Sequence, residues 1–185
     1  MNAATEQDVD REFVARLKDL VRRSDRARLA ALRQLLAPPE RWGPDAYAAG
    51  LPLVPPRALE TEESRLLLVA GLFALWHRGR ETLLEDEPRN FGTSMRTAAT
   101  MLANGATLAP SIENRFSVLL SSDEERLTHH LRQAVSLCAA HDVRIGWVSL
   151  IGDLRRWSHP DRFIQRRWAR AFWSPNTEHP GEETQ

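Results

Sequence analysis

Arginine is the residue type in this chain with the clearest chemical potential. The 185 residues contain 25 basic side chains, of which only Lys18 is a lysine, balanced by 25 acidic ones. Residues 126–173 hold nine arginines against three acids, and residues 22–33 hold five arginines against Asp25. Guanidinium groups bind phosphate bidentately and stack on planar groups. This clustering on a neutral chain predicts a surface for a nucleic-acid backbone, or else ordinary solvated helix faces.

Individual arginines differ in how they relate to the apolar pattern. Arg155 and Arg166, together with three neighbours, project away from the apolar stripes of their segments, which favours exposure. Arg96 and Arg115 border apolar faces in a segment that is otherwise poor in positive charge. Such an arginine either binds the carboxyl end of a helix or is available to a partner. The sequence alone leaves both readings open.

The other reactive side chains form no catalytic or metal-binding pattern. His129 and His130 are adjacent and would project about 100° apart on a helix, which is poor geometry for one metal ion. Cys138, the single cysteine, lies on an apolar stripe and is expected in the core, and it excludes an internal disulfide. There is no glycine-rich phosphate loop. We therefore expect no enzyme activity, no metal and no cofactor.

Tryptophan is concentrated in the same basic third of the chain. Aromatic rings stack on unpaired bases, at about 1–3 kcal/mol each. However, these tryptophans share helix faces with apolar residues, so we expect them in the core: Trp147, Trp157, Trp168 and Trp173.

The elements that carry these residues are predicted to be helices throughout. Apolar residues recur at helical spacing in nearly every segment, and no strand pattern stands out. A proline-rich connector between Pro38 and Pro56 contains one short helix after Pro44. The predicted fold is an all-α, two-lobed bundle of about seven to nine helices. The later helices are expected over residues 62–77 (a central core element), 91–103, 111–121, 122–140, 147–154 and 158–172.

Three polar residues or pairs predict helix starts. Thr61 is expected to cap the apolar helix that follows it. Ser122 with Glu125, and Ser158 with Asp161, have the spacing of capping boxes.

The predicted domain organisation has three parts. Residues 1–9 are a flexible N-terminus, and residues 10–173 form the helical domain, with lobes at about 10–90 and 91–173. Residues 174–185 are a disordered polar tail, and residues 78–90 a mobile loop. The longest apolar run covers residues 66–76, too short to cross a membrane, and the first ten residues have no secretory pattern. We expect a cytoplasmic protein that does not bind membranes.

A series of short motifs in order resembles a known family over about residues 10–173. No single motif is specific, and the weight comes from their order and spacing. They are Asp25-Arg26-Ala27-Arg28-Leu29, Leu72-Phe73, Phe91-Gly92-x-Ser94-Met95, Asn114-Arg115-Phe116, Leu119-Leu120, His130-Leu131-Arg132, Gly146-Trp147, Asp153-Leu154-x-x-Trp157 and Trp168-Ala169-x-x-Phe172. The series resembles the small subunit, CasB type, of the type I-E CRISPR Cascade surveillance complex.

The resemblance implies an all-helical, non-enzymatic subunit, present as two copies beside other Cascade proteins. Members of the family contact guide RNA, target DNA and the displaced DNA strand through basic surfaces without reading sequence. Arg115 and Arg132 match basic positions of the family's motifs, and Arg26 and Arg28 fall in its basic N-terminal stretch. The candidate nucleic-acid-binding residues are Arg22, Arg26, Arg28, Arg33, Arg96, Arg115, Arg132, Arg155 and Arg166.

Other functions remain as alternatives. The main one is a helical protein–protein adaptor whose arginine faces dock acidic partners. An enzyme with an unrecognised site is a third reading. A helix-turn-helix repressor is weaker still, because no compact helix–turn–recognition helix unit stands out.

Overall fold

The protein is all-helical over the residues that its computed structural model describes, which are 3–80, 89–103 and 108–174. These ranges contain nine α-helices, three short 3₁₀-helices and no strand, which confirms the predicted fold class. The α-helices are α1 (Ala3–Arg22), α2 (Arg26–Leu32), α3 (Pro44–Gly50), α4 (Glu60–Trp76), α5 (Phe91–Leu102), α6 (Pro110–Ser121), α7 (Glu124–Ala140), α8 (Trp147–Arg155) and α9 (Phe163–Trp173). The 3₁₀-helices are η1 (Arg33–Leu36), η2 (Pro39–Arg41) and η3 (Leu51–Leu53).

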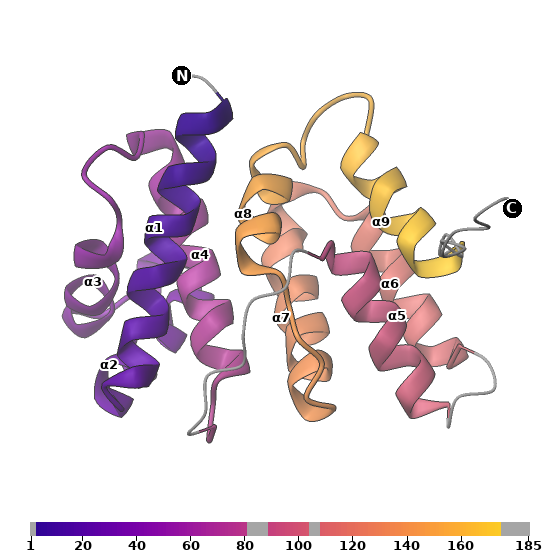
Figure 1. Ribbon diagram of the computed structural model, residues 1–185, viewed down its shortest axis with the longest axis horizontal. Coiled ribbons are helices and arrows are strands. Elements are labelled where there is room, and N and C mark those ends of the chain that lie inside the picture. The colour runs from indigo at the N-terminus through magenta and orange to yellow at the C-terminus, as the bar shows by residue number, and fades with distance from the viewer. Residues whose placement is uncertain (1–2, 81–88, 104–107, 175–185) are drawn as a thin grey trace, which may run out of the picture.

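The helices form two groups in space. In Figure 1, α1–α4 lie on one side of the molecule and α5, α6 and α9 on the other, with α7 and α8 between them. One cluster of buried apolar residues runs through both groups, from Phe13 to Phe172. The division into two lobes near residue 90 therefore stays a prediction.

The central helix is α4, as its apolar sequence predicts. Its residues 66–76 are buried except for Leu68 and Leu75, which are partly buried. It packs against α7 and α8 on one side and against α2 and η1 on the other. A Cβ atom on Gly71 would lie 2.9 Å from the Leu36 side chain, so the glycine permits the close approach of η1.

Helix α9 is held against α5 by an even closer approach. A Cβ atom on Gly92 would lie 2.1 Å from the carbonyl oxygen of Trp168, so the two backbones can meet only where α5 carries a glycine. The Trp168 ring is fully buried, with its centroid 5.0 Å from those of Phe91 and Trp157. Its indole N–H donates to Asp153 Oδ2 at 2.5 Å. This packing fixes which face of α9 meets solvent.

The first helix begins earlier than expected. The structure places α1 from Ala3, whereas we predicted a flexible segment to residue 9. Val9 is fully buried and Asp10 is 2 % exposed, because this end of α1 packs on α8. The mobile loop expected within 78–90 and the disordered tail coincide largely with residues 81–88 and 175–185, which lie outside the described residues.

The helices occupy the predicted segments, but all three predicted caps are wrong. Helix α4 begins at Glu60, before Thr61, and has no side-chain cap. At α7 the cap is Asp123, whose Oδ1 accepts from the backbone N–H of Arg126 at 3.0 Å, while Ser122 donates backwards to the Leu119 carbonyl. Helix α9 begins at Phe163, after the predicted Ser158–Asp161 box, because Arg162 adopts a left-handed conformation with φ 49°.

Candidate nucleic-acid interface

The N-terminal arginine cluster lies where α1 turns into α2. Arg22 ends α1, is exposed, and pairs with Asp19 at 2.7 Å. The Asp25 carboxylate caps α2 by accepting from the backbone N–H of Arg28 at 3.0 Å. Arg26 occupies the exposed first position of α2. Of this cluster, Arg22 and Arg26 lie where a partner could reach them.

Two further members of that cluster, Arg28 and Arg33, serve the fold. Arg28 is partly buried and its Nε donates to the Ala49 carbonyl at 3.1 Å, which ties α2 to the end of α3. Arg33 is partly buried and its Nη1 lies 3.5 Å from the Ala74 carbonyl in the last turn of α4. Burial, with the nearby charge of Arg78, lowers the pKa of Arg33. Both side chains therefore bind carbonyls near the ends of neighbouring helices.

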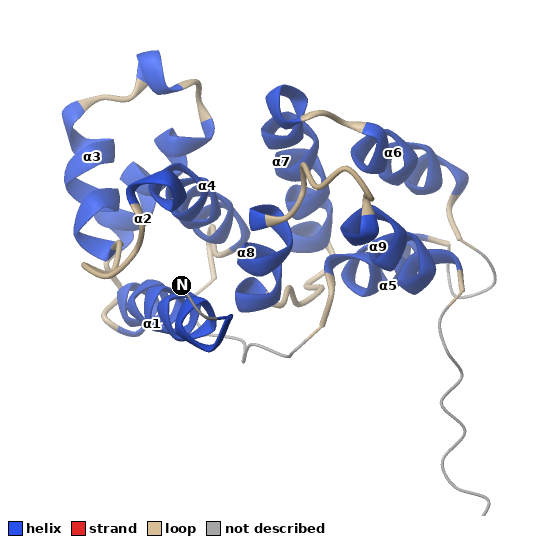
Figure 2. Cartoon of the chain, turned by 90° about the horizontal axis from the view of Figure 1, so that it is seen from above, coloured by secondary structure: helices blue, strands red, loops and turns tan. Residues whose placement is uncertain are grey.

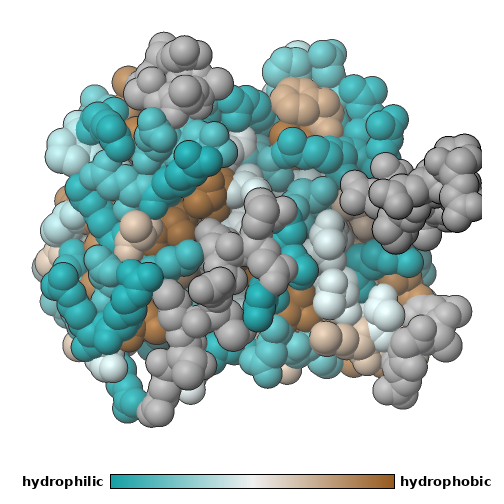
Figure 3. Space-filling model, in the orientation of Figure 1, coloured by the Kyte–Doolittle hydropathy of each residue, from teal (hydrophilic) through white to brown (hydrophobic). Residues whose placement is uncertain are grey.

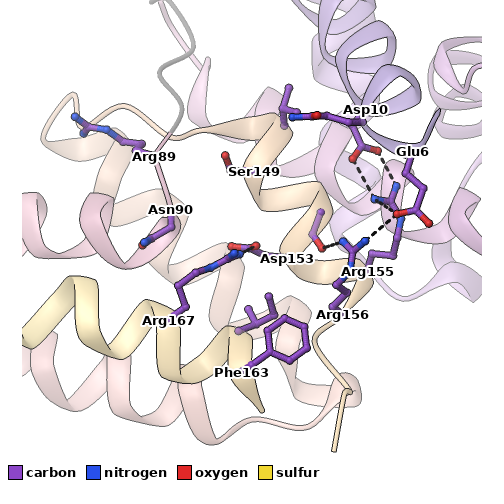
Figure 4. Close-up of a pocket in the computed structure, with 14 residues that line it drawn as sticks. Glu6, Asp10, Arg89, Asn90, Ser149, Asp153, Arg155, Arg156, Phe163 and Arg167 are labelled. Carbon is purple, nitrogen blue, oxygen red and sulfur yellow. Dashed lines mark hydrogen bonds and ion pairs between the residues drawn. The ribbon is translucent and has the colours of Figure 1, made fainter. Parts of the chain in front are cut away.

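Arg155 was expected to be exposed, and this expectation is wrong. Its side chain is 12 % exposed and lies among carboxylates of α1 and α4 (Figure 4). Both of its terminal nitrogens donate to Asp10, at 2.7 and 3.1 Å, and its Nε donates to Glu62 Oε1. The Glu6 carboxylate lies 3.7 Å away and also pairs with Arg156 at 2.9 Å. Arg155 thus joins α8 to two helices of the N-terminal group.

The electrostatics of this cluster follow from its burial. Burial raises the pKa of the Asp10 carboxyl, although the hydrogen bonds and charge of Arg155 act in the opposite direction. For Arg155, burial opposes the charged form, but the carboxylates of Asp10 and Glu62 outweigh it and raise the pKa. A guanidinium so engaged is not available to a phosphate.

Arg96 is likewise committed to the fold. It is partly buried on α5, and its Nη1 donates to the Phe172 carbonyl in the last turn of α9 at 2.6 Å. The sequence left open whether Arg96 binds the carboxyl end of a helix or is available to a partner, and the structure shows that it binds the end of α9.

Arg115 and Arg132 are the candidates that the structure brings together. Both are exposed, on α6 and α7, and neither guanidinium group forms a hydrogen bond or ion pair with any described residue. They line one open depression of about 650 Å³ together with His129, Gln133 and Ser136. In Figure 2, α6 and α7 lie at the edge of the molecule opposite α1. The face that carries α1 is shown in Figure 3 and is also largely hydrophilic.

The depression has an apolar neighbour and a neutral histidine. A smaller cavity of about 240 Å³ adjoins it, with Met95, Val118, Ala134 and Leu137 in its walls and Arg115 at its rim. Burial, followed by the effect of His129, lowers the pKa of His130 in that wall. The lowered pKa favours the neutral form of His130, whereas the guanidinium groups of Arg115 and Arg132 carry positive charge.

Arg166 lies on a different surface, on the exposed side of α9. Like Arg115 and Arg132, it has no partner among the described side chains. Near it, Trp173 is 41 % exposed, so the prediction that it belongs to the core is wrong. Trp147, Trp157 and Trp168 are buried as predicted.

Sequence reasoning missed a cleft between the N-terminal helices and α7. It measures about 640 Å³ and has Arg132 on its rim with Arg41 and Arg65, which were not among the candidates. Glu124 and Glu125 share the rim, and Glu124 lies 3.6 Å from Arg65. No sequence signal marks this cleft, because its walls come from η1, η2, α4 and α7.

Within the described ranges, no group of three or more histidine, cysteine or acidic residues is placed to hold a metal ion. Cys138 is fully buried, which confirms its expected place in the core, and burial raises the pKa of its thiol to about 12. Such a thiol does not ionise at neutral pH and is a poor nucleophile. None of the helices described here is both long and apolar enough to cross a bilayer.

Comparisons with known proteins agree with the resemblance in the sequence. Residues 28–173 match the family CRISPR-associated protein Cse2. A Cse2 protein of Thermus thermophilus is 35 % identical over 149 residues, covering 78 % of this chain and 77 % of the relative.

Solved structures share the fold. A Cse2 family protein from Thermus thermophilus superposes with a TM-score of 0.68 and 30 % identity, over 89 % of this chain and 97 % of that one. A chain of a CRISPR RNA-guided surveillance complex superposes with a TM-score of 0.70 and 26 % identity, over 90 % and 92 % of the two chains. With the profile match over most of its length, the chain belongs to the Cse2/CasB family, the small subunits of type I-E Cascade.

Proposed function

We propose that this protein is a non-catalytic structural subunit of a CRISPR RNA-guided surveillance complex that binds nucleic acid without reading its sequence. It stabilises the hybrid of guide RNA and target DNA and the displaced DNA strand. Its partners are other Cascade subunits and a second copy of itself, in the cytoplasm. Its family and its likeness to a chain of such a complex support this assignment.

The observation that carries the proposal is the pair Arg115 and Arg132. Both guanidinium groups are exposed over one depression, and no described carboxylate neutralises them. The neighbouring Gln133 and Ser136 add hydrogen-bonding groups. Such groups bind phosphate oxygens, which are the same at every base, so the surface holds a backbone without selecting a sequence.

The test is the salt dependence of target binding by the assembled complex. Arg115→Ala with Arg132→Ala should lower the slope of log K against log salt by about 1.4–1.8, since each phosphate contact contributes about 0.7–0.9. Between 50 and 200 mM salt, a fourfold change, the wild-type complex should therefore lose about seven- to twelve-fold more affinity than the variant.

A matched control removes the same charge elsewhere. Arg11→Ala with Arg57→Ala takes away two exposed arginines, outside the candidate set, that pair with Asp8 and Glu12. This variant should keep the wild-type slope. If the Arg115/Arg132 variant assembles and binds with an unchanged slope, the α6–α7 surface is not the interface.

The cleft between the N-terminal helices and α7 favours a second function, docking of a protein partner. Its rim mixes Arg41 and Arg65 with Glu124 and Glu125, while Leu36 and Trp42 contribute apolar walls. Mixed charge around an apolar floor suits a protein side chain better than a polyanion. Arg41→Glu, a charge reversal at an exposed position of the rim, should then release the subunit from the complex while leaving the salt slope of the remaining bound fraction unchanged.

A further inference from the structure

The exposed face of α9 carries a line of arginines that ends at an exposed tryptophan. Arg162, Arg166, Arg170 and Trp173 follow one another at intervals of four, four and three residues, which places them on one face of a helix. All four are exposed. Arg167, on another face, pairs with Asp153 instead.

Two of these arginines are uncommitted. Arg162 donates to the Leu120 carbonyl at the end of α6. The guanidinium groups of Arg166 and Arg170 form no hydrogen bond or ion pair with any described side chain or carbonyl. Asp161 is the acidic residue in the lining of the adjoining groove, so positive charge dominates this face.

Trp173 is held in place although its ring is exposed. Its indole N–H donates to Glu113 Oε1 at 3.1 Å, and its ring lies 5.6 Å from that of Phe116 and 4.9 Å from that of Phe172. These contacts fix the orientation of the indole before any ligand arrives. Fixing a side chain in advance reduces the entropy lost on binding.

The indole borders a groove between α6 and α9 of about 550 Å³. Leu120 and Ala169 give it apolar walls, and Arg162 and Arg166 stand at its rim. An apolar slot with a fixed aromatic ring and adjacent guanidinium groups combines the two features that retain single-stranded nucleic acid, a stacking surface and positive charge.

We propose that this groove binds single-stranded DNA, with one unpaired base stacked on Trp173 and the adjoining phosphates at Arg166 and Arg170. A duplex keeps its base faces covered, so only an unpaired base offers a ring to the indole. The inference rests on the proposed function, in which guide and target pair with each other and the displaced strand is left without a pairing partner.

The site is distinct from the depression on the other flank of α6. Arg115 and Val118 face α7, whereas Ser117, Leu120 and Ser121 border the groove with α9. The two surfaces can therefore be altered separately.

The experiment measures binding of an oligo-dT strand and of a duplex of equal length to the full-length chain. Trp173→Leu keeps apolar bulk and removes the aromatic face. It should weaken oligo-dT binding about five- to 150-fold, the equivalent of one lost stacking contact, and leave duplex binding unchanged. Trp173→Phe retains a ring and should lose less. Arg166→Ala with Arg170→Ala should lower the salt slope for oligo-dT by about 1.4.

Fluorescence gives a second readout. Four of the other tryptophans are buried and Trp42 is partly buried, so Trp173 should dominate quenching by oligo-dT. That quenching should disappear in Trp173→Phe. If Trp173→Leu fails to fold, the fluorescence of Trp173→Phe still tests whether the indole contacts the strand.

Two results would overturn the inference: unchanged oligo-dT affinity in Trp173→Leu, or an equal loss for strand and duplex. If those results accompany the expected loss for Arg115/Arg132, only this site fails. If the Arg115/Arg132 variant also behaves as wild type, the proposed function fails with it.

Discussion

Arg155 shows how strongly a single guanidinium can couple distant segments. It is held by Asp10 on α1 and Glu62 on α4, which are 145 and 93 residues away in sequence. Asp10 and Glu62 are 2 % and 5 % exposed, so each would be an unpaired buried charge without Arg155. Each carboxylate has lost hydration on folding, and the charge and hydrogen bonds of Arg155 compensate for that loss.

Replacing Arg155 by alanine should therefore destabilise the fold by about 3–5 kcal/mol, because it leaves two buried carboxylates uncompensated. Urea denaturation followed by circular dichroism measures this change. Arg156→Ala is the control, since Arg156 is 42 % exposed and pairs with Glu6 at the surface, and it should cost at most about 1 kcal/mol. Equal losses in both variants would mean that the buried cluster contributes no special stability.

His77 gives the fold a dependence on pH. It caps the end of α4, is 4 % exposed, and packs on Phe73 and Trp76 with ring centroids 4.3 and 4.8 Å away. Burial, then the charges of Arg80 and Lys18, lowers its pKa from 6.5 to about 4. The unfolded chain therefore takes up a proton first as the pH falls, so stability is lost between about pH 6.5 and 4.

The expected loss from His77 over that window is about 3 kcal/mol, at 1.36 kcal/mol for each unit of pKa difference. The measurement is the free energy of unfolding at pH 7.5 and pH 4 for the wild type and for His77→Gln, because the difference cancels the other titrating groups. Identical pH dependence in the two proteins would show that His77 is not held neutral.

The candidate site was only partly predictable at this scale. The sequence indicated arginine as the candidate residue type, and of the candidates Arg115 and Arg132 lie exposed together. It could not separate these from Arg96 or Arg155, whose partners lie 76 and 145 residues away. Whether an arginine is free depends on what the fold places beside it, and helical periodicity carries no information about that.

At the scale of elements, the contact between α5 and α9 sets the position of the α9 surface. The two helices meet at Gly92 so closely that an added Cβ atom would lie 2.8 Å from the Cα atom of Trp168. The clash is with backbone, so no side-chain rotation relieves it.

Gly92→Ala should thus force α5 and α9 apart and cost about 1–3 kcal/mol or more. Gly152→Ala in α8 is the matched control, because its nearest neighbour would be Arg156 Nη1 at 4.0 Å and alanine has the better helix propensity. Thermal unfolding should show a lower midpoint for Gly92→Ala and an equal or higher one for Gly152→Ala. Tolerance of alanine at Gly92 would contradict the close approach.

Element positions were predictable, whereas element ends were not. The apolar repeat of α4 and α7 is long enough to identify each helix by itself. Ser122 and Asp123 are adjacent residues that can both cap α7. The Ser122 side chain is buried and donates to the Leu119 carbonyl, and Asp123 is the residue that caps the helix. At α9, the left-handed conformation of Arg162 sets the first residue of the helix. Arginine has no preference for this conformation, so the sequence did not predict this helix start.

For the whole molecule, folding neutralises part of the positive charge that the sequence concentrates in residues 126–173. On α1, Asp10 pairs with Arg155 and Glu6 pairs with Arg156. Asp153 pairs with Arg167. The arginines of the C-terminal half left without a partner among the described residues are fewer than the composition suggests. They are Arg115, Arg126, Arg132, Arg166 and Arg170.

The isolated chain should consequently bind nucleic acid weakly, with strong salt dependence and no sequence preference. Contacts by Arg115 and Arg132 alone give a slope of log K against log salt of about −1.4, and contacts by all five give at most about −4.5. Fluorescence anisotropy with unrelated oligonucleotides at 50 and 200 mM salt measures both properties. A constant affinity across that range would contradict counterion release, and the arginines would then be better explained as docking groups for acidic proteins. A slope steeper than about −4.5 would show that exposed arginines of the N-terminal half, such as Arg22 and Arg26, also contact phosphates.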